Sequence, residues 1–129
     1  MYRGKIFGRE VEMQGSPYTL LVFKNEFEED LSQHVDRLQR QLKENEVDIE
    51  GYLRVAWAMA RTYDDKVDYY DRWLEEFPDE FDFTADGRLE TFSVIVSAMN
   101  AELFRQEQSI RERIKRFIRR IKLRFGLCR

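Results

Sequence analysis

Few side chains in this sequence are of types that could carry out catalysis or bind a metal. His34, the only histidine, lies between Leu31 and Leu38 in a predicted helix with no serine or cysteine paired to it. We interpret it as a solvated or helix-edge residue rather than a catalytic base. Cys128, the only cysteine, has no second thiol and no neighbouring base, so we interpret it as a free surface thiol. The glycines form neither a GxGxxG nor a GxxxxGK(S/T) motif. The sequence therefore predicts no catalytic residue and no cofactor.

One loop has the spacing of a calcium ligand set. Asp82, Thr84 and Asp86 stand at positions one, three and five of such a loop, and Gly87 stands at the sharp turn at position six. Position twelve, however, is Ser93, where a bidentate glutamate is needed. We favour no metal here and an ordinary Asp-Gly turn, with Thr84 or Asp86 capping the next helix, over the calcium alternative.

The elements that must position these residues are predicted to form one domain. The chain has 129 residues, of which 43% are hydrophobic and 14% aromatic, enough for a real core. Ile6 and Phe7, followed by alternating Val11 and Met13, predict a short N-terminal β-hairpin with Gly8-Arg9 as its turn. No signal peptide and no apolar run of roughly 20 residues is present, so we expect a cytoplasmic protein.

Helical periodicity and capping residues dominate the rest of the chain. We expect helices over about residues 17–27, 31–42, 48–60, 68–77 and 88–103. Ser16-Pro17, Asp30 and Asp48 begin the first three, and Pro78 ends the fourth. The predicted fold class is mainly α, with about five helices, a short N-terminal hairpin and a basic amphipathic C-terminal helix. The core is expected to include Leu20, Phe27, Trp57, Trp73 and Phe92.

Charge divides the chain into two parts. Residues 105–129 hold ten Lys and Arg and two acids, net +8, so residues 1–104 carry the remaining −11 of the total of −3. We therefore distinguish an acidic, mainly helical domain (1–104) from a basic amphipathic helical tail (105–129). The tail repeats apolar residues at helical spacing, which makes them the predicted partner-binding stripe: Ile110, Ile114, Phe117, Ile118, Ile121 and Phe125. A basic patch flanks them: Arg113, Arg116, Arg119, Arg120, Lys122 and Arg124.

Three segments resemble tail assembly chaperones of long-tailed bacteriophages and their prophages. They are residues 17–27 (PYTLLVFKNEF), 52–62 (YLRVAWAMART) and 73–77 (WLEEF), in that order. The resemblance covers roughly residues 5–104 and leaves the basic tail outside it. It implies a small, mainly helical, non-enzymatic protein of the host bacterial cytoplasm. Members of that family bind the long, apolar tape measure protein during tail morphogenesis and help the tail tube protein assemble around it.

The basic tail has other interpretations that the sequence leaves open. An amphipathic helix with apolar and basic faces can pair with an apolar helix of a partner protein, which we favour. It can instead pack on its own domain or on a second copy, giving a homo-oligomer. The alternative function is that of a small membrane-surface or nucleic-acid-associating regulatory protein that uses this helix. Nucleic acid is the least favoured partner because the acidic domain would repel it.

Overall fold

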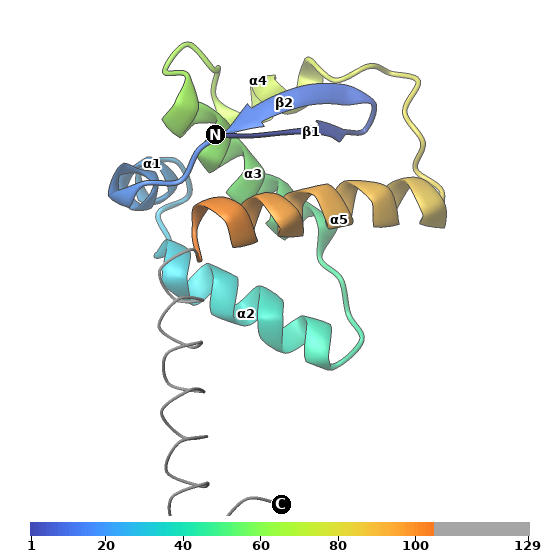
Figure 1. Cartoon of the computed structure of the whole chain (residues 1–129), viewed down its shortest axis with the longest axis horizontal. Helices are drawn as coiled ribbons and strands as arrows, with labels where there is room; N and C mark the ends of the chain where they lie inside the picture. The colour runs from blue at the N-terminus through green and yellow to red at the C-terminus, as the bar shows by residue number, and fades with distance from the viewer. Residues whose placement is uncertain (105–129) are drawn as a thin grey trace, which may run out of the picture.

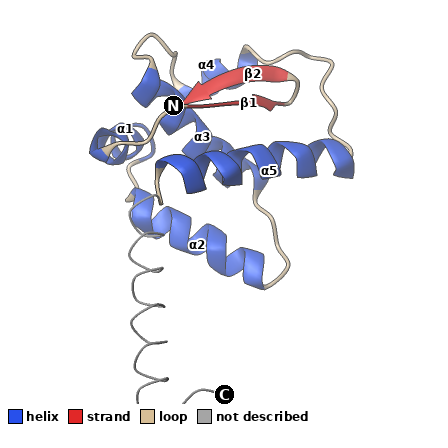
Figure 2. Ribbon diagram, in the orientation of Figure 1, coloured by secondary structure: helices blue, strands red, loops and turns tan. Residues whose placement is uncertain are grey.

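The structure is a computed structural model that describes residues 1–104 (Figure 1). The predicted fold class is confirmed there, because five helices follow a two-stranded antiparallel hairpin (Figure 2). The predicted C-terminal helix lies outside the described residues. The elements, in chain order, are β1 (Tyr2–Ile6), β2 (Arg9–Met13), α1 (Pro17–Phe27), α2 (Leu31–Lys43), α3 (Ile49–Tyr63), α4 (Tyr70–Glu75) and α5 (Ala85–Glu102).

The hairpin has a two-residue turn one position earlier than the sequence predicted. β1 and β2 pair from Tyr2 opposite Met13 to Ile6 opposite Arg9, so Arg9 belongs to the strand. Phe7 and Gly8 form the turn, with φ angles of 47° and 81°. Two successive residues with positive φ match the right-handed twist of the paired strands. This geometry places Phe7 at the tip of the hairpin, where its ring is only partly buried.

Helix α3 forms the centre of the domain. It contacts all four other helices and β2, and its alanines let these neighbours approach closely. Trp57 is 1% exposed, and its indole N–H donates to the carbonyl oxygen of Asp68 at 2.8 Å. Trp73 of α4 is 2% exposed. The predicted burial of both tryptophans is therefore confirmed, while Phe27 and Phe92 are partly buried and pack against the core.

Helix α1 faces inward with different residues from those predicted. Leu20 is 48% exposed, so its predicted place in the core is wrong. Thr19 is fully buried instead, and its hydroxyl oxygen lies 2.8 Å from that of Thr62 in α3. Thr19 also completes a capping box with Ser16, which fixes the rotation of the first turn. The capping and the threonine pair together turn Leu20 outward.

The two predicted caps, Ser16 and Asp30, begin α1 and α2, Asp48 caps α3 at its predicted start, and a fourth cap determines the start of α5. The side chains of Ser16, Asp30 and Asp48 accept from backbone N–H groups of α1, α2 and α3. Thr84 caps α5, which therefore starts before Asp86-Gly87 rather than after it. Helix α4 is shorter than predicted at both ends. No helix within residues 1–104 is long and apolar enough to cross a membrane.

Candidate functional site

The residues that the sequence singled out for partner binding lie outside the described part of the chain. This applies to the apolar stripe of Ile110, Ile114, Phe117, Ile118, Ile121 and Phe125. It applies equally to the basic patch of Arg113, Arg116, Arg119, Arg120, Lys122 and Arg124, and to Cys128. A candidate site within residues 1–104 must therefore be built from other side chains.

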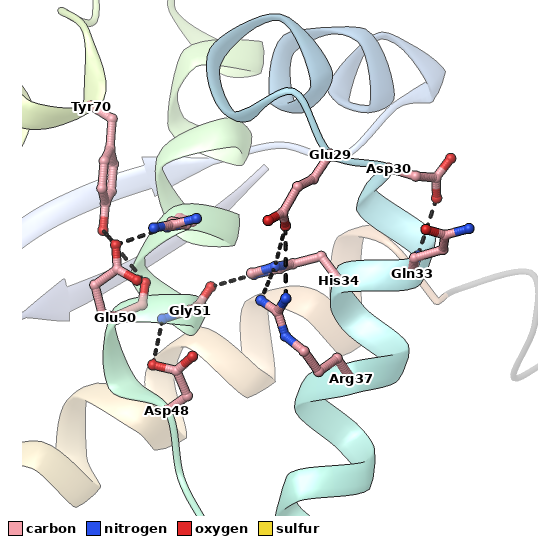
Figure 3. Close-up of polar contacts among 10 residues, drawn as sticks. Glu29, Asp30, Gln33, His34, Arg37, Asp48, Glu50, Gly51 and Tyr70 are labelled. Carbon is pink, nitrogen blue, oxygen red and sulfur yellow. Dashed lines mark hydrogen bonds and ion pairs between the residues drawn. The ribbon is translucent and has the colours of Figure 1, made fainter.

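His34 is the centre of a polar cluster between α2 and α3 (Figure 3). Its Nε2 lies 2.9 Å from the carbonyl oxygen of Gly51, and its Nδ1 lies 2.8 Å from a guanidinium nitrogen of Arg37. Because Arg37 can only donate, Nδ1 accepts and Nε2–H donates to Gly51 in the neutral ring. Glu29 lies 3.3 Å from Nδ1 and 4.0 Å from Arg37.

The burial of His34 indicates its role in the protein. Its side chain has 0% exposure, so the predicted solvated position is wrong. Both ring nitrogens are engaged, and the ring also packs 4.9 Å from that of Phe23. A ring held in this way ties the first turns of α2 to the start of α3. We assign His34 a structural role.

A second polar cluster joins α4 to α3. The Tyr70 hydroxyl donates to a carboxylate oxygen of Glu50 at 3.1 Å, and the same oxygen accepts from Arg54 at 2.8 Å. Burial raises the pKa of Tyr70, and the nearby Glu50 charge raises it further. Figure 3 shows Tyr70 and Glu50 pointing toward one another. The neutral Tyr70 hydroxyl is a hydrogen-bond donor, and its bond to Glu50 holds the short helix α4 against α3.

In the loop with calcium-like spacing, the oxygen atoms of Asp82 and Thr84 accept hydrogen bonds from groups of the same loop. The Asp82 carboxylate accepts from the Thr84 backbone N–H at 2.9 Å and from the Thr84 hydroxyl, and these bonds lower the pKa of Asp82. Thr84 in turn accepts from the N–H of Gly87 at 3.4 Å. Of the two caps predicted for the next helix, Thr84 or Asp86, the structure has Thr84. Residues 1–104 contain no group of three or more His, Cys, Asp or Glu side chains that could hold a metal.

The outer face of α1 is an exposed apolar surface. Tyr18, Leu20 and Leu21 are 57%, 48% and 52% exposed, and we call these three residues the α1 face. The other exposed residues of α1 are Pro17, Lys24 and Asn25, so this side of the helix carries no carboxylate. That is unusual on a domain with a net charge of −11 over residues 1–104. An apolar surface without carboxylates is suited to binding another apolar surface.

Sequence reasoning missed this face although a signal was present. Residues 18–23 contain five apolar or aromatic side chains and one threonine, more than a single buried stripe requires. Such a helix must leave part of its apolar surface uncovered or bury it against a partner.

A second exposed apolar surface consists of three phenylalanines. Phe7 lies with its ring centroid 5.1 Å from that of Phe81 and 6.4 Å from that of Phe83, and the last two are 5.7 Å apart. Phe81 and Phe83 are 45% and 58% exposed. We call Phe7, Phe81 and Phe83 the aromatic patch. It brings the hairpin turn together with the loop before α5.

Comparisons of this chain with protein-family models, with curated proteins and with solved structures found no match.

Proposed function

We propose that this chain is a non-enzymatic tail assembly chaperone of a long-tailed bacteriophage or prophage that binds the tape measure protein during tail morphogenesis. The observation that carries the proposal is the α1 face, which exposes Tyr18, Leu20 and Leu21 within a segment that resembles that family. The tail tube protein is a further proposed partner. The proposed place of action is the host bacterial cytoplasm.

Chaperoning a long helical protein requires an apolar surface that is exposed on a stably folded domain. The core of residues 1–104 is complete without the α1 face, since Phe23, Trp57 and Ile95 are buried while the α1 face is exposed. Covering the exposed leucines with an apolar helix removes their surface from water, which favours binding at roughly 25 cal/mol for each Å². The apolar stripe of residues 110–125 would supply a second contact of the same kind.

Charge supports an apolar protein as the client of the α1 face. The face has no carboxylate of its own, whereas the domain around it is acidic. An apolar helix can therefore dock without burying an unpaired charge, and polyanions are repelled by the surrounding domain. The second candidate function, a membrane-surface or nucleic-acid-associating regulator, is favoured by the net charge of +8 over residues 105–129.

The two candidate functions respond differently to salt. Binding to phosphates weakens by about 10³ to 10⁵ between 50 and 200 mM salt when six to ten phosphates are contacted. Apolar helix pairing does not weaken in this way. We expect the full-length protein to bind a tape-measure-like helical peptide more tightly than it binds anionic vesicles or RNA at physiological salt. That peptide complex should also survive at about 300 mM salt.

The experiment is a titration of the intact protein with all three ligands, each at low and high salt. Tighter binding of vesicles or RNA at physiological salt, lost at high salt, would reject the chaperone proposal in favour of the second candidate function.

A further inference from the structure

Contacts with α5 hold two members of the aromatic patch, Phe7 and Phe83, at the surface. Phe7 adopts a φ of 47°, a conformation that costs energy for a bulky residue. Its backbone N–H donates to the Thr91 hydroxyl at 3.1 Å, which fixes the hairpin turn on α5. Arg88 lies over the Phe83 ring with its guanidinium carbon 5.2 Å from the ring centroid. Phe7 and Phe83 are therefore held by contacts within the domain, and Phe81 packs edge-on against both of their rings.

Carboxylates surround this patch along the chain. Residues 71–90 hold eight acids and two bases, a net charge of −6. The acids closest in sequence to Phe81 and Phe83 are all exposed: Asp79, Glu80, Asp82 and Asp86. Four exposed carboxylates thus outnumber Arg88, the one cation that residues 1–104 place over a ring of the patch, and an apolar centre with a net negative surrounding suits a ligand that combines apolar and cationic side chains. A purely apolar helix would bring no cation to these carboxylates.

The chain itself contains a segment with this chemistry. Residues 105–129 carry a net charge of +8, and Ile and Phe recur among the basic residues. We propose that the aromatic patch receives the basic C-terminal segment, residues 110–125, of a second copy of this protein. Residues 110–125 hold eight bases and one acid, a net charge of +7, which is opposite to the −6 of residues 71–90 and similar in size. The partner's Ile and Phe side chains would cover the phenylalanine rings.

The place where the described chain ends favours a second copy over the same chain. The patch lies near Thr91 in the first half of α5, whereas the described chain ends at Phe104, just past the other end of that helix (Figure 1). The twelve helical residues from 91 to 102 span about 18 Å. Within one chain the segment starts beyond the far end of α5, and the six residues from 105 to 110 span about 20 Å, enough to reach the patch, only when fully extended. A second copy has no such restriction.

The contact would join unlike surfaces of two copies. Each copy offers one patch and one basic segment, so association is head to tail and can extend beyond a dimer or close into a ring. The basic segment's apolar stripe would then be covered when no client is bound. This inference does not depend on the proposed function, because it concerns contacts between copies of the chain.

Two full-length variants test the contact. The patch variant is Phe81→Ser with Phe83→Ser, and the stripe variant is Ile114→Ser with Phe117→Ser and Ile121→Ser. Sedimentation velocity over a concentration series should show self-association of the wild-type protein, and each variant should weaken it by roughly tenfold or more. Raising salt from about 50 mM to about 500 mM should weaken the wild-type association as well. An equimolar mixture of the two variants should form a one-to-one dimer, since each supplies the surface that the other lacks.

Controls keep the result interpretable. Leu89→Ser changes an apolar residue of α5 that is 59% exposed and lies outside the patch, so it should associate like the wild type. Circular dichroism should show each variant folded. If the patch variant does not fold, the charge reversal Asp79→Lys with Glu80→Lys replaces it and should weaken association equally. A monomeric wild-type protein, a patch variant that associates normally, or a variant mixture that stays monomeric would each overturn the inference.

Discussion

Replacing the two leucines of the α1 face should weaken client binding without unfolding the protein. Full burial of a leucine side chain is worth about 2 kcal/mol. Leu20 and Leu21 are 48% and 52% exposed, so about half of that stabilisation remains to be gained from each when a partner covers them. Leu20→Ser with Leu21→Ser should therefore cost about 2 kcal/mol of binding free energy, or roughly a 30-fold rise in Kd.

The assay for this prediction compares the double variant with wild type by calorimetric titration against the same tape-measure-like helical peptide. Leu89→Ser is the matched control, since Leu89 is 59% exposed on a different helix, and its Kd should not change. The free energy of unfolding of the double variant should stay within about 0.5 kcal/mol of wild type, because exposed residues contribute little to stability. A change in Kd below about threefold, with the fold intact, would refute the assignment of the α1 face.

Three further predictions concern the clusters that hold the domain together. His34→Ala should cost about 2–4 kcal/mol in denaturant unfolding, because it leaves the Gly51 carbonyl without its donor in a buried place; a loss below about 1 kcal/mol would contradict a structural role. The folded pKa of Tyr70 is raised above the unfolded value of 10.0, so its stabilisation is complete below pH 10 and is lost at higher pH. The Tyr70→Phe variant should therefore lose less stability than wild type between about pH 10 and about pH 12, and equal losses would count against this contribution. Trp57→Ala should cost about 3–5 kcal/mol, and native tryptophan emission should be blue-shifted and resist iodide; easy quenching would disprove its burial.

Local signals in the sequence predicted the elements better than they predicted which residues meet. Asp30 and Asp48 identified helix starts because a cap is a contact between residues two or three positions apart. The exposure of Leu20 could not be predicted in the same way, since α1 is apolar on more than one side and its rotation depends on the Thr19–Thr62 contact with α3. Which side of such a helix faces inward is decided by distant parts of the chain.

The polar cluster at His34 and the aromatic patch could not be predicted from the sequence either. The burial of His34 depends on the Gly51 carbonyl, 17 positions away in the sequence. The aromatic patch joins Phe7 to Phe81, which are brought together only when the hairpin docks on α5. Neither contact follows from periodicity or spacing. The predicted stripe of residues 110–125 stays a prediction, because it lies outside the described residues.

The most direct test of the chaperone proposal is the solubility of its client. Under this proposal the phage or prophage that encodes this chain also encodes a tape measure protein, which would be produced alone, with the full-length wild-type protein, and with the Leu20→Ser and Leu21→Ser double variant. The proposal predicts that wild type keeps the client soluble and copurifies with it, and that the double variant does so much less. A client that stays insoluble with wild type, or that is equally soluble in all three cases, would contradict the proposed function.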